Sequence, residues 1–451
     1  MKQLRTRLNR LHPDHKRIAQ GAMRVAFFLL IGKMAGAIKE IAVAHRYGVS
    51  DIVDAYQFTL TMANWLPVTM VGAFSIVLIP ALVKARYAGQ HERTRFILEL
   101  QGWIVVLGVL LSIATYLFWP QVLQYTGGNL SAQTKQASLE LIHAFAPAVL
   151  LTLVIGVCTS RLRAHERHIN NLLDSIPALM ILAAILVTPG NVSVYPLLWG
   201  TLLGYLIQAV WLSALARKAD GGNWGWPKPG LQSPQWPMLL NAAGIMLVGQ
   251  VAMSFVGPLD QMAAASLGSN ANATLGYATR LLSLLIGIGA ASVGRAALPV
   301  LADVQSRGNP AQARSMALKW SALMLMVGTA AVLLGWFLAP WLVKLLFENG
   351  AFTAEDTLKV ASVLRWGLLQ LPFYFGVLIL VQLMASQNRY KLMAIIAIGN
   401  FSLKACMNVI LAPVMGAEGI MLATSLMYLL SYLCYFFAVL KYGATKKTSS
   451  A

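Results

Sequence analysis

Twelve apolar runs of about 20 residues each divide this chain, and a helix of that length spans a lipid bilayer. Only 11% of the 451 residues are charged, whereas soluble proteins have about 25%. The sequence therefore predicts an all-α polytopic membrane protein. The runs lie at residues 18–44, 52–83, 96–119, 138–160, 169–187, 196–216, 238–257, 273–301, 320–339, 359–385, 392–411 and 419–440.

The basic residues alternate between the loops. The N-terminus, the C-terminus and the loops on their side hold 24 of the 35 Lys and Arg residues, and the opposite loops hold only three. Cytoplasmic loops are the ones enriched in Lys and Arg, so both termini are predicted to be cytoplasmic. The same asymmetry accounts for the net charge of +19 without a nucleic-acid partner.

The longest cytoplasmic loop, 217–237, divides the spans into two sets of six. We expect a basic N-terminus at 1–17, an N-lobe at 18–216, this linker, a C-lobe at 238–441 and a tail at 442–451. Pro80, Leu82, Gly89 and Arg95 recur as Pro299, Leu301, Gly308 and Arg314, all 219 residues later. A parallel repeat of this kind relates two lobes by an axis along the membrane normal, with substrate bound between them.

The first apolar run carries Arg24, Lys33, Lys39 and Glu40, and Asp54 opens the second. A charge at bilayer depth costs roughly 3 kcal/mol on insertion scales, so we expect these side chains to line a water-filled cavity. Lys33 and Glu40 are seven residues apart on one helix face, so an internal pair is the alternative. Arg24 lies near the cytoplasmic end, where its side chain could instead reach the interface.

Two further basic residues lie within later spans. Arg280 is predicted at the same depth as Lys39, Glu40 and Asp54, and Lys404 is near the middle of the eleventh run. Cations gathered at a site that also holds acids suit an anionic ligand such as a diphosphate. The sequence contains no Ser/His/Asp set, no phosphate-binding glycine loop and no metal spacing of its three cysteines. We therefore expect neither an enzyme nor a cofactor, although membrane potential or a monovalent cation could drive the protein.

Two stretches carry a resemblance. They are GAFSIVLIPAL, from Gly72 to Leu82, and LFENGAFTAEDT, from Leu346 to Thr357. Both resemble the signatures of the MurJ/MviN family. The order of the sequence elements, including YATRLLSL around Arg280, is also similar to that of the family. That family is grouped with MATE drug exporters and polysaccharide flippases. The resemblance implies two six-helix lobes around a central cationic cavity. It also implies translocation of a polyprenyl-diphosphate-linked sugar across the bacterial inner membrane.

The chain departs from that family at several positions. Lys33 and Lys39 stand where the family has arginines, Pro67 and Val68 replace an arginine pair, and Val71 replaces a glutamate. Members typically have fourteen spans, against twelve here. These departures make an exopolysaccharide repeat unit as suitable a substrate as lipid II.

The predicted function is a flippase for an undecaprenyl-diphosphate-linked saccharide, working by alternating access from the cytoplasmic to the periplasmic face. Lys33, Lys39 and Arg280 would hold the diphosphate, and Asp54 would order these cations or couple to an ion. Glycosyltransferases or a polymerase of the same pathway are the expected protein partners. The alternatives are a MATE-like cation-coupled drug exporter and a non-transporting scaffold for cell-envelope synthesis.

Overall fold

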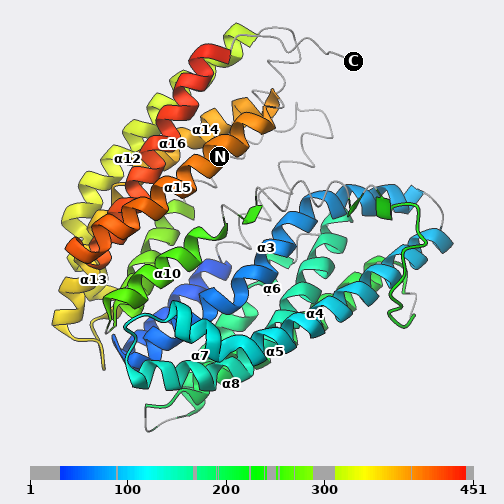
Figure 1. Cartoon of the computed structure of the whole chain (residues 1–451), viewed down its shortest axis with the longest axis horizontal. Coiled ribbons are helices and arrows are strands. Elements are labelled where there is room, and N and C mark those ends of the chain that lie inside the picture. Colours follow the sequence, from blue (N-terminus) through cyan, green and yellow to red (C-terminus); the bar gives the residue numbers. More distant parts are fainter. Residues whose placement is uncertain are drawn as a thin grey trace, which may run out of the picture. The chain divides into compact units, whose positions relative to one another are not determined.

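The structure is a computed structural model that describes residues 31–87, 90–165, 170–188, 190, 192–222, 225–237, 239–240, 250–251, 254–268, 270–287, 310–387 and 389–442. These residues are almost entirely helical, and they contain no strand (Figure 1). Two helices, 31–47 and 271–287, are named here by their numbers. The others are α3 Asp51–Tyr87, α4 Gln90–Thr126, α5 Ala132–Ala164, α6 Asn170–Leu173, α7 Ile176–Val187, α8 Tyr195–Ala219, α10 Val256–Leu267, α12 Pro310–Phe347, α13 Ala354–Leu368, α14 Leu371–Ser386, α15 Tyr390–Met415 and α16 Ala417–Tyr442.

Seven segments of the described chain are long and apolar enough to cross a membrane. Their backbone groups are satisfied within helices, as a bilayer requires. The predicted all-α polytopic class is therefore confirmed. The predicted tenth span, 359–385, is formed by two helices, because α13 ends at Leu368 and Pro372 lies in the first turn of α14. Proline is tolerated at a helix start, where its missing amide has no partner to lose.

The chain packs into two compact units. Unit 1 comprises 1–42, 66–117 and 143–246, and unit 2 comprises 43–65, 118–142 and 247–451. Helices α3, α4 and α5 each contribute to both units. The division follows packing and not the order of the sequence, so the predicted lobes at 18–216 and 238–441 stay a prediction.

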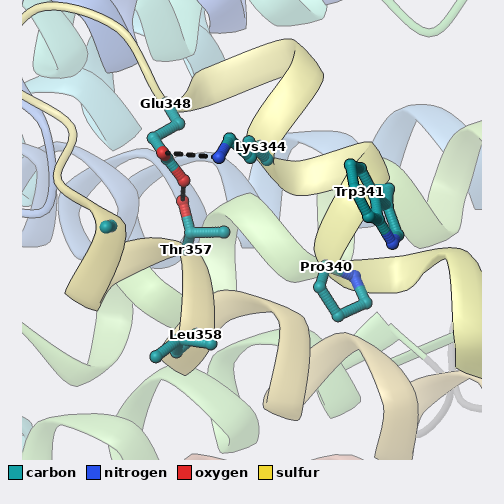
Figure 2. Close-up of a pocket in the computed structure, with 7 residues that line it drawn as sticks. Pro340, Trp341, Lys344, Glu348, Thr357 and Leu358 are labelled. Carbon is teal, nitrogen blue, oxygen red and sulfur yellow. Dashed lines mark hydrogen bonds and ion pairs between the residues drawn. The ribbon is translucent and has the colours of Figure 1, made fainter.

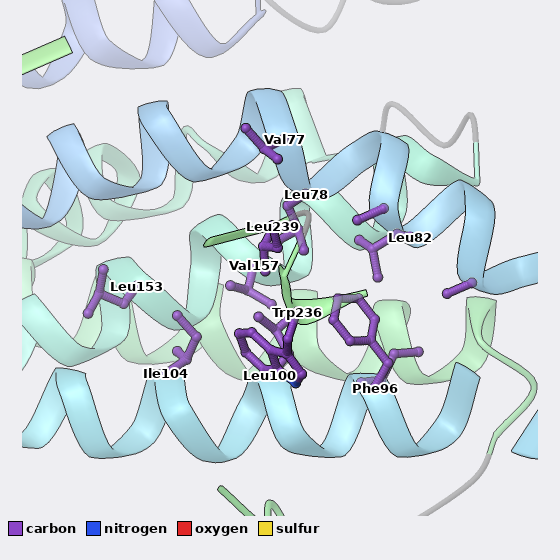
Figure 3. Close-up of a cluster of buried hydrophobic side chains, with 13 residues drawn as sticks. Val77, Leu78, Leu82, Phe96, Leu100, Ile104, Leu153, Val157, Trp236 and Leu239 are labelled. Carbon is purple, nitrogen blue, oxygen red and sulfur yellow. The ribbon is translucent and has the colours of Figure 1, made fainter. Parts of the chain in front are cut away.

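The core of unit 1 holds the predicted linker against α4. Trp236 packs edge-on against Phe96, with ring centroids 5.8 Å apart, among buried aliphatic side chains of α3, α4 and α5 (Figure 3). Glu99 of α4 is buried beneath this loop and accepts hydrogen bonds from Trp236 Nε1 at 2.7 Å and Ser233 N at 3.1 Å. On the same face, Trp103 Nε1 donates to the Gly230 carbonyl at 3.0 Å. Residues 230–236 of the linker are thus fastened to α4.

A second polar cluster in unit 1 lies just beyond the end of α8. Arg161 binds Asp220 Oδ2 through two nitrogens at 2.8 and 2.5 Å, while Arg93 and His165 reach Oδ1 at 2.5 and 2.9 Å. Burial acts to raise the pKa of Asp220, but the charge of Arg161 and the hydrogen bonds outweigh it and hold that pKa below its usual range. We call these four residues the Asp220 cluster.

In unit 2, α12, α14 and α16 pack side by side, and α15 lies between α16 and α10 (Figure 1). The connection from α12 to α13 is set by local chemistry. Thr353 caps α13 by accepting from Asp356 N at 3.2 Å, and Asp356 Oδ2 accepts from Thr353 N at 2.9 Å. This reciprocal pair is a capping box, which fixes where a helix begins.

Candidate functional site

The predicted cations of the first span lie on helix 31–47. Lys39 and Glu40 are both buried, and Lys39 Nζ lies 2.6 Å from Glu40 Oε1. Lys33 is partly buried on the same helix. The structure therefore joins Glu40 to its neighbour Lys39 through a close ion pair. Arg24 lies outside the described residues.

Asp54 lies in the first turn of α3 and is fully buried. Its Oδ1 accepts a hydrogen bond from the amide of Ala273, at 2.6 Å, in the first turn of helix 271–287. A carboxylate is favoured there because the amides at a helix N-terminus are unpaired and partly positive. Asp54 thus caps the helix that carries Arg280. Arg280 is partly buried seven residues further on, about 10 Å along the helix axis.

These contacts follow the 219-residue repeat. Asp54 and Ala273 are 219 residues apart, and so are Gln57 and Gly276. A Cβ atom on Gly276 would lie 2.8 Å from Gln57 Cγ, so these two positions also touch. Equivalent residues contact each other where two related elements cross at a two-fold axis. The crossing of α3 with helix 271–287 therefore behaves as the centre of a pseudo-two-fold repeat within unit 2.

Two backbone hydrogen bonds flank this crossing in related places. In the first, Asn129 N, in the turn between α4 and α5, donates to the Ala265 carbonyl of α10 at 2.9 Å. In the second, Ala351 N, in the turn between α12 and α13, donates to the His45 carbonyl of helix 31–47 at 2.8 Å. Each half thus inserts a hairpin against the first helix of the other. We call these contacts, together with the Asp54–Ala273 bond, the reciprocal clasp.

Glycines permit this close approach. Gly350 has a φ of +68°, and a Cβ there would meet the His45 carbonyl oxygen. Gly128 has a φ of +41°, and a Cβ there would lie 3.0 Å from Ser266 Cα. Both the left-handed backbone and the lack of space favour glycine at these positions. The clasp residues lie at the ends of the spans that the pattern of basic loops predicts to be periplasmic.

The second signature, Leu346 to Thr357, builds one of these hairpins. Thr357 Oγ1 donates to Glu348 Oε2 at 2.7 Å across the turn, and Lys344 Nζ lies 3.6 Å from Glu348 Oε1 (Figure 2). The rings of Phe347 and Phe352 lie 5.2 and 5.4 Å from that of Tyr277. Tyr277 in turn donates to the Gly48 carbonyl at 2.9 Å. The signature therefore shapes and anchors a hairpin.

The same hairpin lines a surface pocket of about 390 Å³, between the last turns of α12 and the start of α13 (Figure 2). Its walls include Trp341, Lys344 and Leu358. Lys344 is partnered by Glu348, which leaves the pocket little net charge for an anion. We assign this pocket no part in substrate binding.

Lys404 of α15 has its side chain fully buried. Its Nζ lies 2.7 Å from Asp260 Oδ1 of α10. The predicted seventh span ended at 257, which put Asp260 in a loop, whereas α10 continues to Leu267. Sequence reasoning therefore missed Asp260 as a partner, although an acid beside a deep lysine could have been sought.

A sequence model of the lipid II flippase MurJ family matches residues 43–450. The chain belongs to this family. It is 24% identical over 458 residues to a probable lipid II flippase MurJ of Bdellovibrio bacteriovorus, covering 97% of this chain and 84% of the relative. The lipid II flippase MurJ of Burkholderia cenocepacia is 23% identical over 440 residues, covering 93% and 83%.

Solved structures show the same fold. A lipid II flippase MurJ in an inward closed conformation is similar with a TM-score of 0.78 and 20% identity, covering 93% of this chain and 87% of that one. An inward-facing multidrug resistance MATE family transporter is similar with a TM-score of 0.75 and 12% identity, covering 95% and 100%. The predicted MurJ/MATE-like architecture is therefore confirmed, and this chain is a membrane transporter of that family.

Proposed function

We propose that this protein moves an undecaprenyl-diphosphate-linked saccharide from the cytoplasmic to the periplasmic face of a bacterial inner membrane. Membership of the lipid II flippase MurJ family carries the proposal. Lipid II, or an exopolysaccharide repeat unit on the same carrier, would be the substrate. No covalent bond need change in this process, so the protein acts as a transporter and not as an enzyme.

In this proposal Lys33, Lys39 and Arg280 hold the diphosphate. Lys39 is the special case, because the 2.6 Å pair with Glu40 already balances its charge. A diphosphate would have to compete with Glu40 for that ammonium. We therefore expect Lys39 to tune affinity and not to dominate it. Arg24 would add positive potential near the cytoplasmic entrance.

Asp54 takes a structural role in this proposal. Its carboxylate caps the helix that carries Arg280, so it sets the position of that guanidinium. Alternating access requires one end of the cavity to be closed while the other is open. The reciprocal clasp, whose members come from both sequence halves, is suited to be the closed periplasmic end. It would have to break before the headgroup leaves.

The membrane potential is the proposed energy source, and enzymes of the same pathway are the proposed partners. Basic groups that move within the membrane field respond to the membrane potential, at about 2.3 kcal/mol per charge per 100 mV. Both termini would be cytoplasmic, where the basic loops lie. Glycosyltransferases or a polymerase of the same pathway would supply or consume the lipid-linked glycan. Nucleic acid has no part in it.

A drug-exporting function is the second candidate, favoured by the TM-score of 0.75 to a multidrug transporter. A cationic drug would enter a cavity rich in lysine and arginine only against electrostatic repulsion. Export of a cationic dye by proteoliposomes, lost in Asp54→Asn, would support the exporter over the flippase.

The direct test uses purified protein in liposomes that hold labelled lipid II or an undecaprenyl-diphosphate-linked repeat unit. Flipping is read as the fraction of label that becomes accessible to a membrane-impermeant reagent. Arg280→Ala and Lys33→Ala should each abolish flipping, while Lys319→Ala, an exposed lysine on α12, should leave it unchanged. No flipping of either lipid by the unaltered protein would refute the proposal, and normal flipping by a variant would remove that residue from the site.

A further inference from the structure

The buried ammonium of Lys404 lies in a cage of oxygen atoms. Its three donors are matched by three acceptors, Asp260 Oδ1, the Ile420 carbonyl and Thr424 Oγ1, each at 2.7 Å. Asp260 comes from α10, Lys404 from α15, and the other two from the first turns of α16. An ammonium has three N–H groups, so this set satisfies it completely.

The same set of atoms is a coordination sphere for a small cation. It contains a carboxylate, a backbone carbonyl and a hydroxyl, which are the oxygen ligands that hard metal ions take in proteins. The Thr424 hydroxyl donates to the Ile420 carbonyl at 3.1 Å, so its lone pairs are free to face the ammonium. One negative charge, on Asp260, matches a monovalent cation and not a divalent one.

Asn408 places a further buried amide group beside Asp260. Asn408 is 2% exposed and lies one turn after Lys404 on α15. Its amide nitrogen donates to Asp260 Oδ1 at 2.9 Å. Within the described part of the chain, no donor reaches its Oδ1. A buried amide oxygen without a hydrogen-bond donor costs free energy. An oxygen in this state is available as an additional ligand for an ion.

The carboxylate of the cage is partly accessible. The side chain of Lys404 is 0% exposed, whereas that of Asp260 is 20% exposed. An ion could therefore reach the carboxylate from its accessible side if the lysine did not fill the centre. A proposed ion site requires such a path as well as its ligands.

We propose that Lys404 is a tethered cation in a pocket built for a monovalent metal ion. The lysine joins α10, α15 and α16 as a bound sodium or potassium ion would, without dissociating. The unaltered protein then needs no ion at this place, and shortening Lys404 converts the pocket into a sodium- or potassium-binding site. An ordinary buried ion pair predicts otherwise, since its loss would destabilise the protein equally in every salt.

The test is thermal unfolding of the purified full-length protein in NaCl, KCl and choline chloride at equal ionic strength. The unaltered protein should have one Tm in all three. Lys404→Ala should have a lower Tm in choline chloride, and that Tm should rise saturably with millimolar NaCl or KCl. Lys404→Met, which fills the pocket without a charge, and Lys404→Ala combined with Asp260→Asn should show no rise.

The proposal fails if Lys404→Ala shows no saturable, ion-specific rise. It fails equally if the unaltered protein shows a rise that Asp260→Asn removes, because an ion would then bind beside the lysine. Lys404→Ser offers a second small variant if Lys404→Ala accumulates poorly. Isolation of either variant in NaCl but not in choline chloride would support the proposal, and failure of both in all salts would oppose it. None of these readings depends on flipping.

Discussion

The reciprocal clasp and the Asp220 cluster fasten this protein in different ways. The clasp joins the two sequence halves within unit 2 through backbone hydrogen bonds, glycine contacts and a single carboxylate, Asp54. The Asp220 cluster joins α4, α5 and α8 of the first half through two arginines and a histidine on one acid. Charge-assisted bonds are about twice as strong as neutral ones, so the second set is the tighter.

This difference fits the work that alternating access demands. Contacts between halves have to form and break in every cycle, so a few backbone hydrogen bonds and one carboxylate, at positions that need close glycine packing, suit them. Contacts within a half have to survive the cycle, so buried ion pairs serve those. Four substitutions test this division, beginning with the one expected to have the largest effect.

Asp220→Ala should destabilise the protein by about 3–5 kcal/mol, because Arg161, 2% exposed, would keep a buried charge without its acid. The measurement is Tm and yield of purified protein. Because the pKa of Asp220 is lowered, this stabilisation is complete above about pH 4 and is lost as the pH falls through the lowered pKa. Tm should therefore be insensitive to this residue's titration between pH 5 and pH 8. An unchanged Tm in the variant would contradict the conclusion that the Asp220 cluster is the tighter of the two sets of contacts.

Gly350→Ala should weaken the clasp by about 1–3 kcal/mol, since the new Cβ would meet the His45 carbonyl in a left-handed backbone. Gly222→Ala is the matched control, because Gly222 has a φ of +79° with nothing within 4 Å. Flipping should fall in the first variant and persist in the second. Equal losses would mean that backbone strain, and not the contact between halves, is responsible.

Asp54→Asn should weaken the clasp by about 1–2 kcal/mol, as a neutral amide is a poorer partner for a helix N-terminus than a carboxylate. The readout is disulfide formation between Gln57→Cys and Gly276→Cys, with Cys158, Cys406 and Cys434 changed to serine. Cross-linking should fall several-fold. Asp51→Asn is the control, because Asp51 binds Ser131 and Thr134 within its own half, each at 2.7 Å. A similar fall with Asp51→Asn would show that the effect is not specific to the clasp.

Features that depend on neighbouring residues could be predicted from the sequence, whereas contacts between distant residues could not. Apolar runs are local, so the helical spans could be predicted, and Lys39 and Glu40 could be placed in one helix. The sidedness that the basic loops indicate stays a prediction. The partner of Asp54 is 219 residues away, and a carboxylate early in a span gives no sign that it caps a distant helix. The partner of Lys404 was missed for a related reason. Asp260 lies just after the end of an apolar run, where a loop residue is expected. In the structure, α10 continues past it.

Glu99→Gln should have the smallest effect, about 1 kcal/mol, and it acts at the junction of the two halves in the sequence. The amide retains the size of Glu99 but weakens its bonds from Trp236 Nε1, Ser233 N and Gln232 N. Because this loop is fastened to α4 within unit 1, we expect faster hydrogen–deuterium exchange over 225–237 with little change in Tm. Glu92→Gln, at an exposed acid in the first turn of α4, is the control. If the linker serves only as a connector, flipping will be unaffected by Glu99→Gln. A loss of flipping at unchanged Tm would mean instead that the anchored loop transmits movement between the halves.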